Sequence, residues 1–262
     1  MQGPSPAVAS VPADPVWVLR PEPRDRAALR LLCVPYAGGG TAVYHAWAAG
    51  LPDWIDVWLV RLPGREVRLR ERPRTDLLEL VRELAAALAP ALDRPFALFG
   101  HSLGALISFE LARELRARYG LEAAHLTVSA RTAPEVPQPG RMSRLLSDEE
   151  FLEVLDRRFG AVPPELRTDP EMRALYLPML RGDITMLETY RYRPAAPLCC
   201  PITALAGSAD DEATPSDLLA WGRHGTGGFD HVVHEGGHFF LRPHREAVLA
   251  RLEGDLARTL VP

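Results

Sequence analysis

The chain has 262 residues, of which 47% are apolar and 24% are charged, and these values exclude a disordered or fibrous protein. The formal net charge is −4 and every cationic residue is an arginine, which excludes both a broadly basic surface for nucleic acid and a lysine nucleophile. The apolar runs are too short to span a bilayer and no secretory signal opens the chain, so we expect a cytoplasmic protein that binds neither membrane nor nucleic acid.

The three cysteines are Cys33, Cys199 and Cys200. An odd number with an adjacent pair does not form a disulfide framework, and structural zinc requires four ligands in paired clusters. We therefore expect free thiols in a reducing compartment, and a protein with neither a metal nor another cofactor.

The chain begins with residues 1–29, which are rich in proline, alanine and charged residues and predict a partly loose leader with one strand at 16–19. Short apolar runs then alternate with segments of helical periodicity. The runs predict strands at 31–34, 56–60, 96–99, 125–128, 202–205 and 231–234. Continuous apolar strands that alternate with helices predict an α/β fold, in which helices cover both faces of a mostly parallel sheet.

Three helices accompany these strands. The first is predicted over 77–88, with Thr75 as a candidate cap and Pro90 as its stop. The second runs from Leu103 to Tyr119 and ends at Gly120, and the third opens at Pro243 and reaches about Leu260. Each begins or ends at a residue whose backbone preference favours a helix boundary.

Residues 140–195 show no strand pattern and predict a helical insertion. Ser147 and Glu150 form a capping box that begins its first helix. A second helix begins at 168–171 and a short third one covers 184–190. The core of the fold would then comprise residues 30–139 and 196–262.

The sequence Gly100-His101-Ser102-Leu103-Gly104 fits the pattern G-x-S-x-G. It directly follows an apolar run and directly precedes a predicted helix, which is the strand–turn–helix setting that a nucleophile elbow requires. The helix N-terminus would point free N–H groups at whatever binds there. We therefore predict that Ser102 is a nucleophile.

A serine hydroxyl needs a base, and enzymes with this elbow place first an acid and then a histidine after the serine. His238 lies in a glycine-rich loop between the last predicted strand and the last predicted helix. His231 and His234 fall within the strand pattern and are interpreted as structural. We predict that His238 is the base.

Two further elements would complete such a site. The acid that orients the imidazole should follow the strand at 202–205, and both Asp210 and Asp211 qualify by position. An oxyanion hole needs two backbone N–H donors. One is predicted at Leu103 and the other in the glycine-rich loop 35–40.

With these residues, the sequence resembles the type II thioesterases of the α/β-hydrolase superfamily, the stand-alone editing enzymes of polyketide and nonribosomal peptide assembly lines. The resemblance extends over nearly the whole chain, from about residue 30 to 260. The segments that carry it are 33–39, 61–66, 96–105, 188–192 and 236–241.

The resemblance implies that Ser102 is the nucleophile and His238 the base, and that the backbone amides of Ala37 and Leu103 are the oxyanion donors. The family's acid lies in a stretch of the form G-x-x-D, which selects Asp210. The implied substrate is an acyl group on the phosphopantetheine arm of an acyl carrier protein or peptidyl carrier protein. The arm belongs to the substrate and is not a cofactor, and we expect a monomer.

The resemblance also implies that the insertion 140–195 is a lid over the acyl pocket. Its apolar residues would face that pocket, or would instead form the lid's own core. The residues are Phe151, Leu155, Phe159, Met172, Leu175, Met179 and Met186. Leucine and methionine lining would suit pliable recognition of acyl chains.

Six arginines crowd the segment from Arg61 to Arg74 of an otherwise acidic protein. They are Arg61, Arg65, Arg68, Arg70, Arg72 and Arg74. Arginine suits both an acidic carrier protein and the phosphate of its arm, so the cluster is either a docking surface or a solvated face.

Three other functions remain open at this stage. The chain could be another hydrolase of the same fold that acts on small esters or amides. It could also be a chain-releasing thioesterase. A third possibility is an inactive protein that only binds acyl groups or a carrier protein, although an intact set of serine, acid and histidine argues against it.

Overall fold

The computed structural model describes residues 13–136, 142–160 and 162–260. Within these residues a sheet of seven strands runs in the order β1-β3-β2-β4-β5-β6-β7, and only the β1–β3 pair is antiparallel. The strands are β1 (Val18–Leu19), β2 (Leu29–Val34), β3 (Ile55–Val60), β4 (Phe96–His101), β5 (His125–Ser129), β6 (Ile202–Gly207) and β7 (Phe229–His234). The predicted mostly parallel sheet is confirmed.

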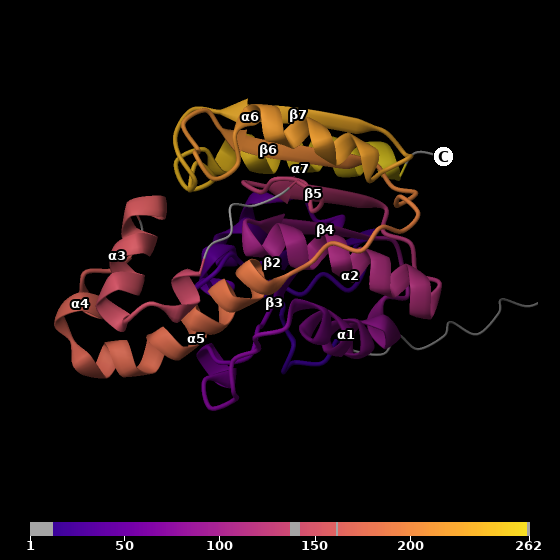
Figure 1. The fold of residues 1–262 in the computed structure, drawn as a ribbon. Coiled ribbons are helices and arrows are strands. Elements are labelled where there is room, and N and C mark those ends of the chain that lie inside the picture. Colours follow the sequence, from indigo (N-terminus) through magenta and orange to yellow (C-terminus); the bar gives the residue numbers. More distant parts are fainter. Residues whose placement is uncertain (1–12, 137–141, 161, 261–262) are drawn as a thin grey trace, which may run out of the picture.

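Helices cover both faces of the sheet, and the helices α3 to α5 extend to one side of it (Figure 1). The helices are α1 (Leu77–Leu88), α2 (Leu103–Tyr119), α3 (Asp148–Phe159), α4 (Glu165–Thr168), α5 (Pro170–Thr189), α6 (Pro215–Leu218) and α7 (Arg245–Thr259). Short 3₁₀ helices lie at Thr41–Val43, His45–Gly50, Glu66–Arg68, Ala89–Ala91, Ser143–Leu145 and Leu219–Arg223. None of the helices in the described ranges is long and apolar enough to cross a membrane.

Successive side chains of a strand point to opposite faces of the sheet, and this divides the apolar core around the sheet into two layers. In β2, Leu32 and Val34 pack toward the face covered by α1 and α2, while Leu31 and Cys33 pack toward the face covered by α7. Every residue of this strand is buried. A strand buried on both sides explains why its sequence is a nearly continuous apolar run.

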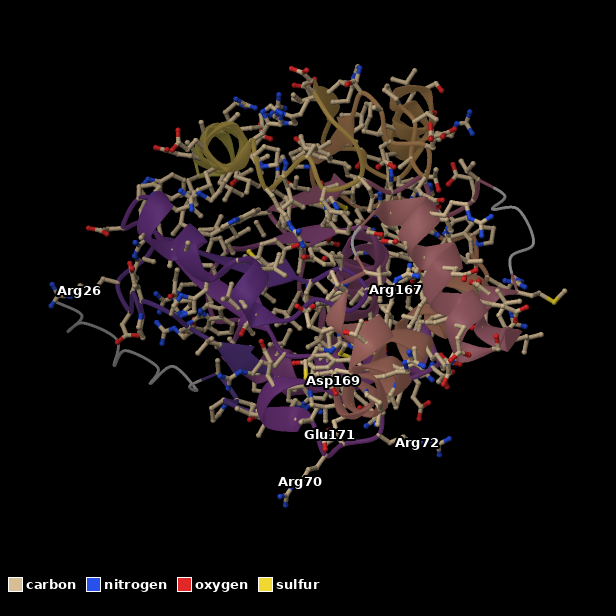
Figure 2. All side chains as sticks on the ribbon, turned by 90° about the vertical axis from the view of Figure 1, so that its left-hand side faces the viewer. Arg26, Arg70, Arg72, Arg167, Asp169 and Glu171 are labelled. Atoms are coloured by element: carbon tan, nitrogen blue, oxygen red, sulfur yellow. The ribbon has the colours of Figure 1, made fainter. Side chains whose placement is uncertain are left out.

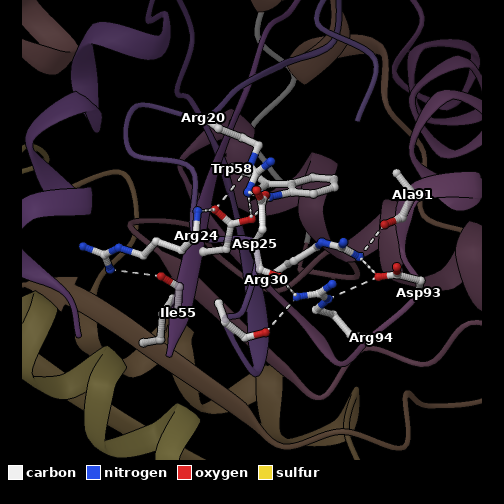
Figure 3. A network of polar contacts seen from close by, with 11 residues as sticks. Arg20, Arg24, Asp25, Arg30, Ile55, Trp58, Ala91, Asp93 and Arg94 are labelled. Carbon is white, nitrogen blue, oxygen red and sulfur yellow. Dashed lines mark hydrogen bonds and ion pairs between the residues drawn. The ribbon is translucent and has the colours of Figure 1, made fainter. Parts of the chain in front are cut away.

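Part of the leader, including Trp17 and Val18, packs against the core, whereas residues 1–12 lie outside the described residues. Trp17 is buried beneath the guanidinium of Arg68 at 3.8 Å from its ring centroid. Arg24 donates to four main-chain carbonyls, including those of Ala48 at 2.6 Å and Ile55 at 3.0 Å. Figure 3 shows the contact from Arg24 to Ile55 within a larger network that includes Arg20, Arg30 and Arg94.

Two helix starts differ from the prediction by one or two residues. Asp76, not Thr75, caps α1, because its carboxylate accepts the backbone N–H of Glu79 at 2.9 Å. Helix α7 begins at Arg245, two residues after the predicted start at Pro243. The capping box at Ser147 and the stop of α2 at Gly120 are both as predicted.

The two helices predicted near 170 and 184 are a single helix, α5, which also contains Pro178. An internal proline usually breaks a helix, but here the second half is held by buried contacts. Asp183 within it is buried, and Gly182 lies so close to the segment 73–74 that a Cβ would approach the carbonyl of Arg74 to 2.9 Å. The predicted start of the insertion at residue 140 lies outside the described residues.

Candidate active site

Ser102 occupies the sharp turn between β4 and α2. Its backbone has φ 55° and ψ −114°, an unusual conformation for a residue other than glycine. The turn is held by a hydrogen bond from the Ser102 amide to the carbonyl of Ser129 at 2.8 Å. Such local strain is typical of functional sites, and here it presents the serine at the C-terminal edge of the sheet.

The two glycines of the motif are required by close backbone approach. A Cβ on Gly100 would lie 2.1 Å from the carbonyl oxygen of Gly104, and a Cβ on Gly104 would lie 2.2 Å from that of Val34. No side chain fits these distances. The motif therefore encodes the tight crossing of β4, α2 and β2 beneath the serine.

His238 and Asp210 come from the two loops that follow β7 and β6. The His238 Nδ1 lies 2.9 Å from Asp210 Oδ2, and both side chains are buried. Because a carboxylate only accepts hydrogen bonds, this contact assigns the proton to Nδ1 and leaves Nε2 as an acceptor. Asp211 is exposed, so of the two candidate acids the structure brings only Asp210 to the histidine.

Glycine also permits the approach of these two loops. A Cβ on Gly207, the last residue of β6, would lie 2.4 Å from the carbonyl oxygens of both Gly236 and Gly237. The other carboxylate oxygen of Asp210 accepts the backbone N–H of Glu212 at 3.0 Å. The acid is thus fixed by its own loop while it orients the imidazole of His238.

Aromatic rings surround His238 on several sides. The rings of Phe159, His101 and Phe239 have centroids 4.8, 5.2 and 5.1 Å from that of His238. His101 is fully buried and its Nδ1 contacts the Ser129 hydroxyl at 2.9 Å. Burial lowers the pKa of His101 well below its usual range, so this imidazole is neutral beneath the site.

The two predicted oxyanion donors lie at the ends of β2 and β4. Leu103 is the first residue of α2, so its N–H has no intrahelical acceptor. Ala37 lies between Tyr36, whose carbonyl accepts from Gly39 at 2.9 Å, and Gly38, whose N–H donates to Asp183 at 2.8 Å. Among the described residues, no acceptor within the protein engages the Ala37 amide. Neither Ala37 nor Leu103 is among the residues that line the cavity at Ser102, so the role of their amides as oxyanion donors stays a prediction.

Ser102 and His238 line one cavity of about 740 Å³. The cavity is of a size that suits a small-molecule substrate. Its apolar wall includes Phe159, Ile184 and Leu187, and arginines and glutamates lie around it. The sequence analysis missed Ile184 and Leu187, although the adjoining segment 188–192 was among those that carried the resemblance.

Of the seven apolar residues predicted to face the acyl pocket, only Phe159 lines this cavity. Phe151 and Leu155 form the interior of the helical insertion, with Met172 packed against them. Met186 joins the core beneath the sheet, Met179 is buried elsewhere and Leu175 is exposed. Helical periodicity predicts that a helix buries one face. It does not indicate whether that face packs inside the insertion or lines a substrate pocket.

Most of the arginine cluster is used within the structure rather than presented to a partner. Arg65 and Arg68 are buried, and Arg74 pairs with Glu83 at 2.9 Å. Only Arg70 and Arg72 are exposed, and both project from the molecule in Figure 2. Arg61 is half-buried and donates to the carbonyl of Pro15 at 2.6 Å. The six arginines therefore do not form one continuous exposed surface.

No group of three or more histidine, cysteine, aspartate or glutamate side chains in the described part of the chain is placed to hold a metal ion. The three cysteines carry free thiols, and only Cys199 is exposed.

The chain is similar to known proteins in both sequence and structure. The model of the thioesterase domain family matches residues 29–256. The chain is 43% identical to a protein named linear gramicidin dehydrogenase LgrE, from Brevibacillus parabrevis, over 94% of both chains. The word dehydrogenase belongs to that protein's name alone.

Two solved structures are similar throughout. The type II thioesterase BorB of the borrelidin biosynthetic cluster is 40% identical with a TM-score of 0.83, and the alignment covers 93% of this chain and 97% of BorB. The thioesterase RedJ of the prodiginine pathway in Streptomyces coelicolor is 38% identical with a TM-score of 0.82, over 95% of this chain and 91% of RedJ. The fold is thus the α/β-hydrolase fold expected from the sequence, and the chain belongs to the thioesterase family and is a thioester hydrolase.

Proposed function

We propose that the protein hydrolyses acyl thioesters on the phosphopantetheine arm of acyl carrier or peptidyl carrier proteins, with Ser102 as nucleophile, His238 as base and Asp210 as the orienting acid. The observation that carries this proposal is that Ser102 and an Asp210-bound His238 line the same cavity. The similarity to stand-alone thioesterases of biosynthetic pathways supports the class of substrate.

The first half of the reaction forms an acyl-enzyme. Ser102 Oγ attacks the thioester carbonyl carbon while His238 Nε2 takes the hydroxyl proton. The negative charge on the carbonyl oxygen is stabilised by the amides of Ala37 and Leu103. The carbon–sulfur bond then breaks, and His238 returns the proton to the pantetheine sulfur as it leaves.

The second half releases the acid. His238 takes a proton from water, the hydroxide adds to the acyl-serine, and the second tetrahedral intermediate uses the same two amides. Collapse of this intermediate breaks the ester bond, and His238 returns the proton to Ser102 Oγ, which regenerates the enzyme. An enzyme of this kind would remove stalled or incorrect acyl groups from an assembly line, and its cytoplasmic location stays a prediction.

Mass spectrometry of carrier proteins that bear different acyl groups tests the proposal. The carrier should lose the mass of its acyl group with the wild-type protein and keep it with Ser102→Ala. A p-nitrophenyl ester at the same concentration serves as the comparison. Faster turnover of the ester than of every carrier thioester would identify a general esterase, whereas binding of the carrier without loss of the acyl group would identify a binding protein.

A further inference from the structure

Buried charges join three separate segments behind the predicted oxyanion hole. Arg65 follows β3, Asp183 lies in the second half of α5, and Gly38 and Gly39 belong to the loop after β2. The side chains of Arg65 and Asp183 are only 5% and 1% exposed. The proposed chemistry uses neither of them.

Four polar groups of this cluster pair with one another, while the buried Arg65 Nε has no hydrogen-bond partner among the described residues. Asp183 Oδ1 accepts from Arg65 Nη2 at 2.7 Å, and Asp183 Oδ2 accepts from the Gly38 amide at 2.8 Å. Arg65 Nη1 donates to the carbonyl of Gly39 at 2.7 Å. The carboxylate and the guanidinium thus hold two consecutive residues of the loop, Gly38 by its N–H and Gly39 by its carbonyl.

The far end of the same loop is held by the residue after Arg65. Glu66 Oε1 accepts from the Thr41 amide at 2.7 Å and from the Thr41 hydroxyl at 2.8 Å. A Cβ on Gly40 would lie 2.6 Å from this oxygen, so the glycine makes room for the contact. Glu66 itself has a positive φ of 52°, which a residue with a side chain rarely adopts. The adjacent residues Arg65 and Glu66 therefore hydrogen-bond to the loop at two places, Gly39 and Thr41.

These contacts bear on the Ala37 amide, which is adjacent to Gly38. The peptide plane that carries the Ala37 N–H also carries the Tyr36 carbonyl, which accepts from the Gly39 N–H at 2.9 Å. Asp183 holds the next peptide plane through the Gly38 N–H, and Arg65 holds Gly39 through its carbonyl, so the pair restricts the Ala37 N–H through the residues that follow it. A buried carboxylate next to an oxyanion hole would also repel the developing negative charge, and the paired guanidinium offsets that charge. A buried ion pair contributes little net stability, and this one instead fixes the position of the loop.

We propose that Arg65 and Asp183 are positioning residues that hold the glycine-rich loop so that the Ala37 amide faces the oxyanion, and that they thereby tie helix α5 to the catalytic machinery. This inference rests on the proposed function. It predicts that loss of the pair lowers the rate of bond making at Ser102 while substrate binding in the cavity is largely retained.

The test compares Arg65→Gln, Arg65→Lys and Asp183→Asn with the matched control Arg74→Gln, which breaks the neighbouring ion pair with Glu83. Each purified protein is measured for kcat and KM on an acyl-pantetheine thioester, for the rate of labelling by a fluorophosphonate, and for Tm. We expect Arg65→Gln to lower kcat and the labelling rate about 10- to 100-fold, with KM changed by less than about threefold, because an oxyanion donor is misplaced. Arg65→Lys keeps the charge but not both contacts and should recover part of the loss.

The control Arg74→Gln should retain kcat within about twofold, since the side-chain hydrogen bonds of Arg74 go to Glu83 and to the carbonyl of Arg72. The inference is overturned if folded Arg65→Gln and Asp183→Asn keep wild-type kcat and labelling rates, even with a lower Tm, because the pair would then be structural only. If Arg65→Gln does not fold, Arg65→Lys and Asp183→Asn decide by the same criterion. A wild-type protein that is labelled at Ser102 but does not hydrolyse the thioester would refute the proposed function instead. The labelling rates of the variants would then still test the role of Arg65 and Asp183.

Discussion

At the residue scale, the carboxylates Asp210 and Asp211 are adjacent in the chain but have different surroundings. Asp210 is buried against His238, and its second oxygen is held by the amide of Glu212. Asp211 is exposed. The sequence alone left both open as acids, because the choice depends on which carboxylate the loop turns inward.

Asp210→Asn should therefore lower kcat by about four orders of magnitude, because an amide cannot hold the imidazole in the required tautomer or stabilise its charged form. Asp211→Asn is the matched control and should leave kcat within about twofold. Steady-state hydrolysis of an acyl-pantetheine thioester measures both. Equal losses in the two variants, or a loss only in Asp211→Asn, would contradict the assignment of the acid.

At the scale of single elements, helix α3 has two functions along its length. Phe151 is fully buried within the insertion, whereas Phe159 at the other end lines the cavity and contacts the ring of His238. The Arg158 side chain beside it pairs with Glu212 at 2.8 Å, which ties the end of α3 to the loop that carries Asp210. The N-terminal part of α3 thus stabilises the insertion, and its C-terminal end shapes the site.

This division predicts opposite effects of two phenylalanine deletions. Phe151→Ala removes a core side chain and should lower the free energy of unfolding by about 3–5 kcal/mol with little change in kcat. Phe159→Ala should change stability less but lower kcat/KM, because it removes a wall of the cavity beside His238. Urea unfolding and thioester kinetics on both variants give the comparison. A larger loss of stability in Phe159→Ala than in Phe151→Ala would show that the two residues have been assigned the wrong way round.

At the scale of the whole molecule, buried histidines make stability depend on pH. His125 in β5 is buried, and its Nε2 contacts Thr203 at 3.1 Å and lies 3.8 Å from Asp255 of α7. Burial lowers the pKa of His125 to about 4, and the neighbouring Asp255 only partly opposes this shift. The folded state therefore keeps this imidazole neutral at a pH where the unfolded chain has already taken up a proton.

The contribution of His125 to stability is complete above its unfolded pKa of about 6.5 and is lost as the pH falls toward about 4. One such group changes the free energy of unfolding by at most about 1.4 kcal/mol per pH unit in this window. We expect wild type to lose stability from pH 6.5 to 5, and His125→Gln to show a smaller slope whatever its absolute stability. Urea unfolding at several pH values measures the slopes, and an equal slope in both proteins would contradict the prediction.

The sequence predicted those parts of the molecule that depend on local pattern. Each strand core, the turn at Ser102 and the end of α2 at Gly120 follow from apolar runs and from residues with a strong backbone preference. The packing of the leader could not be predicted from local pattern, because Arg24 stabilises it through main-chain carbonyls that are distant in the chain. The continuity of α5 and the burial of Arg65 also depend on tertiary contacts, which periodicity and composition do not report.

The central claim is that Ser102 is activated by His238 in one site. Its most direct measurement is the rate and position of covalent labelling by a fluorophosphonate, followed by peptide mass spectrometry. The account predicts one adduct, on Ser102, which is absent in Ser102→Ala and forms at least about 100-fold more slowly in His238→Ala. An adduct on another residue, or an unchanged labelling rate in folded His238→Ala, would contradict it.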